Sequence, residues 1–73
     1  MSKFEMLVEK KNLQNRLMNN AIESTEWYVR CKNRKGIRNA IYAKVFAMYT
    51  KFYCKLMDLN RKDIEKLQKA VVV

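Results

Sequence analysis

Apolar residues recur at intervals of three and four along most of this chain, the spacing of one face of an α-helix. Between Phe4 and Cys31 the apolar positions keep one phase, which predicts a first helix over about 3–34. Asn19-Asn20 is a weak helix-forming pair. A break near Asn20, which would give a three-helix bundle, therefore stays open as an alternative to a continuous helix.

Polar residues at either end of this segment indicate where the helix begins and where the chain turns. Ser2 and Glu5 fit a capping box, in which Ser2 accepts hydrogen bonds from free backbone amides. Residues 33–36 (Asn-Arg-Lys-Gly) form the strongest turn signal. Gly36 suits the left-handed conformation that often follows a helix.

A second helical pattern begins directly after Gly36. Apolar residues recur at positions 37, 41, 45, 48, 52, 56 and 59. A parallel aromatic row widens this face, so a helix is predicted over about 37–69 with a loose tail at 70–73. We expect most of the aromatic row to form the core: Tyr42, Phe46, Tyr49, Phe52 and Tyr53. Beside it runs a ridge of small residues where another helix could approach closely: Ala40, Ala43, Ala47, Thr50 and Cys54.

Two helices of nearly equal length joined by a tight turn predict an all-α, antiparallel helical hairpin. The 73 residues make a single small domain over 1–73. Two helices alone bury too little of such wide apolar faces, so dimerisation into a four-helix bundle is a further prediction. The absence of proline and the single glycine agree with helix throughout.

The distribution of charge along the chain indicates what kind of partner it binds. The chain carries a net charge of +9, and residues 27–57 hold eight basic residues and no Asp or Glu. The flanking segments are nearly neutral. Such a concentration favours a polyanion, an anionic membrane surface or an acidic protein face as the partner.

The candidate binding residues fall into two groups. The first is a cluster around the turn, whose arginines offer planar forks to phosphates: Arg30, Lys32, Arg34, Lys35 and Arg38. The second is a row on one face of the second helix, which could follow a phosphate backbone: Lys44, Lys51 and Lys55. Trp27 falls on the polar arc of the first helix, which makes it a candidate contact anchor. Solvated charge and ordinary packing are the competing interpretations.

Catalytic chemistry finds little support in these residue types. The chain has no histidine, and one glycine cannot make a glycine-rich phosphate loop. Cys31 and Cys54 lie far apart with no third soft ligand, which disfavours zinc. We expect no enzyme, no cofactor and no metal. The longest charge-free apolar run is too short to span a bilayer, and no secretory pattern is present, so a cytoplasmic protein is expected.

Two functions compete on these grounds. One is a non-enzymatic nucleic-acid-binding protein, with RNA ahead of DNA, that neutralises phosphates. The other is a small inhibitor or adaptor that binds an acidic or nucleic-acid-binding surface of a larger protein. A short, Met- and Asn-rich chain without proline resembles, in composition alone, accessory proteins of phages and mobile elements. A basic amphipathic helix lying on a membrane ranks last. Neither nucleic-acid sequence specificity nor a protein partner can be named from the sequence.

Overall fold

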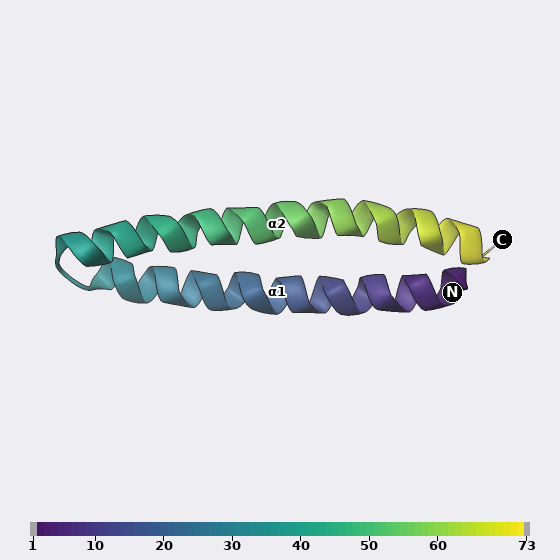
Figure 1. The fold of residues 1–73 in the computed structure, drawn as a ribbon, viewed down its shortest axis with the longest axis horizontal. Coiled ribbons are helices and arrows are strands. Elements are labelled where there is room, and N and C mark those ends of the chain that lie inside the picture. The colour runs from purple at the N-terminus through teal and green to yellow at the C-terminus, as the bar shows by residue number, and fades with distance from the viewer. Residues whose placement is uncertain (1, 73) are drawn as a thin grey trace.

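Two long helices form an antiparallel hairpin in the computed structural model, which describes residues 2–72 (Figure 1). Helix α1 spans Lys3–Asn33 and helix α2 spans Ile37–Val72. The hairpin is a rod of 56 × 15 × 14 Å, with the turn at one end and both termini at the other (Figure 1). The predicted all-α hairpin is confirmed.

The helix limits differ from the predicted ones in two places. Helix α1 is continuous through Asn20, so the three-helix alternative is wrong; exposed asparagines cost only tenths of a kcal/mol of helix propensity each. Helix α2 continues to Val72, so residues 70–72 are helical where a loose tail from 70 was predicted. No glycine or proline stops the helix there. Val73 lies outside the described residues.

The ends of the helices follow the predicted signals with one correction. The Ser2 Oγ accepts a hydrogen bond from the Glu5 amide at 3.1 Å, as the capping box predicts. Gly36 has a positive φ of 121°, but it does not directly follow α1. Arg34 takes that place in an extended conformation, and Gly36 instead precedes α2. Its carbonyl accepts from the Ala40 amide at 3.2 Å.

The two helices meet along a seam whose positions alternate by three and four residues, the spacing of a coiled coil. In α1 these positions are 7, 10, 14, 17, 21, 24, 28 and 31, and in α2 they are 39, 43, 46, 50, 53, 57, 60, 64 and 67. All of them are buried or half-buried. The seam holds small side chains at its centre, including Ala21, Ser24 and Ala43.

The aromatic row was expected to form the core, and this prediction is largely wrong. Tyr42, Tyr49 and Phe52 are each more than half exposed, whereas Phe46 and Tyr53 are half-buried at the seam. The reason is steric, because small side chains let two helix backbones approach closely. Of the small-residue ridge, Ala43 is buried at the seam, and Ala47 and Thr50 are half-buried. Ala40 and Cys54 stay exposed.

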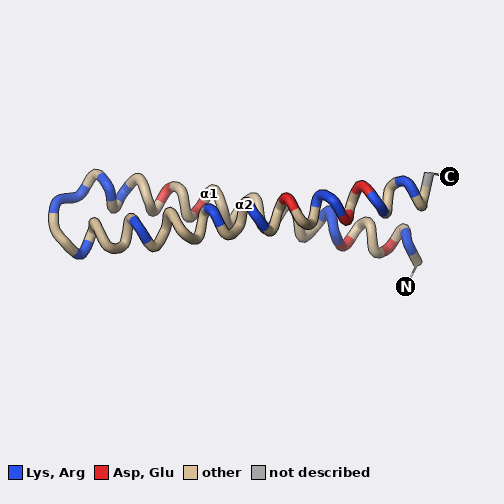
Figure 2. Tube along the Cα trace, turned by 90° about the horizontal axis from the view of Figure 1, so that it is seen from above, with Lys and Arg blue, Asp and Glu red and all other residues tan. Residues whose placement is uncertain are grey.

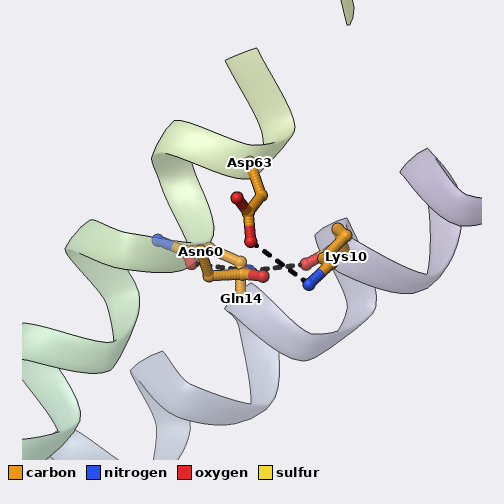
Figure 3. A network of polar contacts seen from close by, with 4 residues as sticks. All are labelled: Lys10, Gln14, Asn60 and Asp63. Atoms are coloured by element: carbon orange, nitrogen blue, oxygen red, sulfur yellow. Dashed lines mark hydrogen bonds and ion pairs between the residues drawn. The ribbon is translucent and has the colours of Figure 1, made fainter. Parts of the chain in front are cut away.

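A polar layer crosses the seam near the termini, formed by Lys10, Gln14, Asn60 and Asp63 (Figure 3). Asn60 is only 5% exposed. Its Nδ2 donates to the Lys10 carbonyl at 2.8 Å and to the Gln14 Oε1 at 3.0 Å. The Lys10 Nζ lies 3.3 Å from the Asp63 Oδ2. A buried asparagine at a seam position fixes which residues of two helices face each other.

Replacing Asn60 and Gln14 together by leucine should raise the free energy of unfolding by about 1–2 kcal/mol. The Asn60 Oδ1 is buried without a partner in the structure, so the layer carries an uncompensated desolvation cost. The gain should come with a less uniquely defined register. Urea denaturation measures the first effect, and doubling of amide NMR signals measures the second.

The matched control is Asn15→Leu, which adds a leucine to α1 next to Gln14, at an exposed position. It should leave the free energy of unfolding, measured with urea, within about 0.5 kcal/mol of the original value. A double variant that unfolds at lower urea with a single set of NMR signals would contradict this role for the layer.

Candidate nucleic-acid interface

The basic cluster of the turn occupies the whole closed end of the hairpin (Figure 2). Arg30 and Lys32 lie in the last turn of α1, Arg34 and Lys35 in the connection, and Arg38 in the first turn of α2. All five side chains are exposed. The first turn of α2 contains no acidic residue. The opposite dipole ends of α1 and α2 meet here and largely offset each other, so the positive potential comes from the side chains.

No residue of the turn cluster forms an ion pair within the part of the chain that the structure describes. Among residues 2–72, the structure contains two ion pairs, Lys10 with Asp63 and Arg61 with Asp58. Both lie in the half of the hairpin that carries the termini, and the acidic residues nearest the turn, Glu23 and Glu26 of α1, belong to neither pair. The predicted binding residues therefore keep their charge available to an external partner.

The second predicted group, Lys44, Lys51 and Lys55, lies along the side of α2 that points away from α1. Their side chains are exposed, and a step of 100° per residue places them roughly opposite the seam. Lys44 and Lys55 are about 16 Å apart along the helix axis at 1.5 Å per residue. We call these three residues the lysine row.

An open groove connects the turn cluster with the lysine row. The groove has a volume of about 360 Å³. Lys32, Arg34 and Lys44 form its basic rim, and Tyr28 and Cys31 line it from α1. Its α2 wall consists of small residues: Ala40, Ala43 and Ala47. We call it the basic groove.

The basic groove arises where small side chains of α2 pass the last turns of α1. Alanine fills little of the space beside the seam, so a hollow remains that larger side chains would occupy. The sequence had marked this ridge only as a surface for helix contact. Tyr28 was not among the predicted site residues, yet the Lys32 Nζ lies 5.6 Å from the centroid of its ring. The spacing of four residues could have paired Tyr28 with Lys32 from the sequence, whereas their position beside the alanines of α2 depends on the register of the two helices.

Arg30 and Trp27 lie on the other side of the seam. The Trp27 ring stacks on Phe46, with centroids 6.1 Å apart and planes at 19°. The Arg30 guanidinium carbon is 5.1 Å from the centroid of the Trp27 ring, within the range of a cation–π contact. Trp27 is still 42% exposed. It thus packs at the edge of the seam and carries an arginine over its ring.

No group of three or more His, Cys, Asp or Glu residues within 2–72 is arranged to hold a metal ion. Neither described helix combines the length and apolar character needed to cross a bilayer.

Comparisons with protein-family models, curated proteins and solved structures give no significant match.

Trp27 should contribute to stability through Phe46. A double-mutant cycle with Trp27→Ala and Phe46→Ala should give a coupling free energy of about 0.5–1.5 kcal/mol in urea denaturation, because the two rings stack. A second cycle pairs Trp27→Ala with Phe52→Ala, whose ring contacts Tyr53 instead. It should show coupling near zero. Equal coupling in both cycles would contradict the stacking account.

Proposed function

We propose that this protein binds nucleic acid, RNA in preference to DNA, through phosphate contacts along the turn cluster, the basic groove and the lysine row. The observation that carries the proposal is the unneutralised rim of the groove. Lys32, Arg34 and Lys44 come from α1, the turn and α2, and they surround one hollow. A strand of phosphates that enters the hollow would meet all three charges, and release of its counterions would drive binding.

The thickness of the hairpin supports RNA ahead of DNA. The two helices together measure 15 × 14 Å across the Cα atoms alone. The major groove of B-form DNA is about 12 Å wide and admits a single helix. The hairpin cannot enter it broadside to read base edges. A-form duplexes and structured RNA present phosphates and 2′-hydroxyls across a wide, shallow groove, which suits contact with a rigid basic surface.

Each group of residues would take a different part in binding. The Arg34 and Arg38 guanidinium groups can engage phosphate oxygens as planar forks. The lysine row can follow the backbone as point charges. Trp27, whose ring already carries Phe46 and Arg30, would serve as a contact anchor through its exposed edge.

A second candidate function, a small inhibitor or adaptor of a larger protein, is favoured by one specific observation. Large apolar side chains of α1 remain in solvent beside the seam: Phe4, Val8, Met18, Ile22 and Val29, each more than 40% exposed. Apolar surface of this extent is typical of protein contacts. Such a partner would depend on apolar contacts and little on salt.

The experiment is fluorescence anisotropy of a labelled structured RNA and a matched DNA duplex, titrated at several salt concentrations. The original protein should bind RNA at micromolar concentration or tighter, with log affinity falling linearly against log salt. The variant Lys32→Glu with Arg34→Glu and Lys44→Glu should lose at least about tenfold in affinity for RNA.

The control carries the same charge change on α1, at exposed positions far from the groove: Lys3→Glu with Lys11→Glu and Arg16→Glu. It should lose about threefold or less, since it affects only long-range attraction. Equal losses of RNA affinity in the two variants would show that only net charge matters and would contradict the groove as the binding site. Weak binding of both ligands, with Ile22→Glu abolishing capture of a protein, would favour the inhibitor or adaptor.

A further inference from the structure

Helix α2 leaves a continuous apolar row in solvent. We call it the outer apolar row, and its members are Ile37, Ile41, Val45, Met48, Phe52 and Leu59. Ile37 is 82% exposed and Met48 69% exposed, and only Val45 falls below half. Val45, Met48 and Phe52 surround an apolar hollow of about 390 Å³ together with Tyr49. Such a row on an isolated hairpin is large enough to require a partner.

The spacing of the row indicates what that partner is. Its members are arranged almost symmetrically about Met48. Ile37, Ile41 and Val45 precede Met48 by 11, 7 and 3 positions, while Phe52 and Leu59 follow it by 4 and 11, with the half-buried Leu56 between them. A helix that carries the same pattern read backwards matches this row to within one position. Ile37 comes level with Leu59 and Met48 with Met48, and every other member lies within one position of an apolar residue of the copy. A second copy of α2, running antiparallel, supplies that pattern, which is the condition for a two-fold symmetric contact.

Charge favours the same orientation. A parallel pair of hairpins would place two turn clusters side by side, at a repulsive cost. An antiparallel pair centred on Met48 instead sets Arg38 of each chain level with Asp58 of its copy. The same pairing sets the turn cluster beside the only acidic residues of α2: Asp58, Asp63 and Glu65. The two halves of the helix are thus complementary in charge as well as in apolar pattern.

The exposed area is sufficient for a stable dimer. Large apolar side chains that are half exposed each offer on the order of 100 Å². The outer apolar row with Tyr49 therefore presents a surface close to the ~800 Å² per partner of a standard interface. The centre of this surface is apolar and aromatic, and lysines lie at its edge, which is the composition of a protein interface core with a polar rim.

We propose that a second copy of this chain docks on the outer apolar row, with the two α2 helices antiparallel and a two-fold axis near Met48. This axis is perpendicular to the plane that contains the two α2 helices, so the rotation leaves each flank of α2 on the same side of that plane. The lysine rows of the two copies therefore lie on one face. This consequence rests on the proposed function: the dimer is then the unit that binds RNA, and six lysines on one surface contact an A-form duplex.

The first test is the mass of the full chain by sedimentation equilibrium from about 1 to 200 µM, without nucleic acid. We expect twice the chain mass of 8.8 kDa. Met48→Gln with Phe52→Gln should reduce it to one chain without changing net charge. The matched control, Met18→Gln with Ile22→Gln, alters similarly exposed residues of α1 and should stay dimeric. A single-chain mass throughout, or dissociation of both variants, overturns the proposal.

Cross-linking tests the orientation independently of any destabilised variant. Both native cysteines are free thiols, so the background is Cys31→Ala with Cys54→Ser. Mixed Ile37→Cys and Leu59→Cys chains should form a disulfide between the two variants on oxidation, and neither should link to itself. Self-linking of Ile37→Cys would show turn beside turn and overturn the antiparallel contact.

RNA binding by the two glutamine variants tests the shared lysine face. Met48→Gln with Phe52→Gln should bind RNA about tenfold more weakly than the control, with a salt slope smaller by about 2 to 3, because a single lysine row remains. Unchanged affinity and slope would overturn this consequence. If the original protein is a dimer that binds no RNA, the proposed function is wrong and the contact between copies is kept. If it is a monomer that binds RNA, the contact is wrong and the proposed function is kept.

Discussion

The close approach of α1 and α2 through small side chains is the constraint on which the rest of the structure depends. Ala21, Ser24 and Ala43 are buried where the helices meet, and Thr50 satisfies its own hydroxyl by donating to the Phe46 carbonyl at 3.0 Å. A seam of this kind brings the backbones together but removes little apolar surface from water. Its register depends on polar contacts, above all those of Asn60.

The remaining features follow from this choice of seam. Because the seam uses one side of α2, the outer apolar row on the other side is free for a second contact. The lysine row points away from α1 and stays charged. The basic groove is the hollow that alanines leave beside the seam, and its rim draws residues from both helices and the turn. A tighter apolar core would have removed both the basic groove and the outer apolar row.

The sequence predicted the elements better than their contacts. Helical periodicity, Ser2 and the turn at 33–36 located both helices to within a few residues, because these are local signals. The seam was predicted only in part, since Phe46 and Tyr53 of the predicted aromatic row do lie at it. Lys10, Gln14 and Asn60 were missed, because apolar periodicity gives no weight to polar side chains. The turn cluster was visible as charge. The groove was not, since it depends on which residues of α1 and α2 stand level with each other.

The most direct test of this account is a disulfide within one chain between the native Cys31 and a cysteine at position 43, in a Cys54→Ser background. Cys31 and Ala43 are both buried at the seam and line the same groove. The account predicts that Ala43→Cys closes this link on oxidation with helicity unchanged by circular dichroism, while Val45→Cys does not. Closure by Val45→Cys, with Ala43→Cys remaining reduced, would place the apolar row against α1 and contradict it.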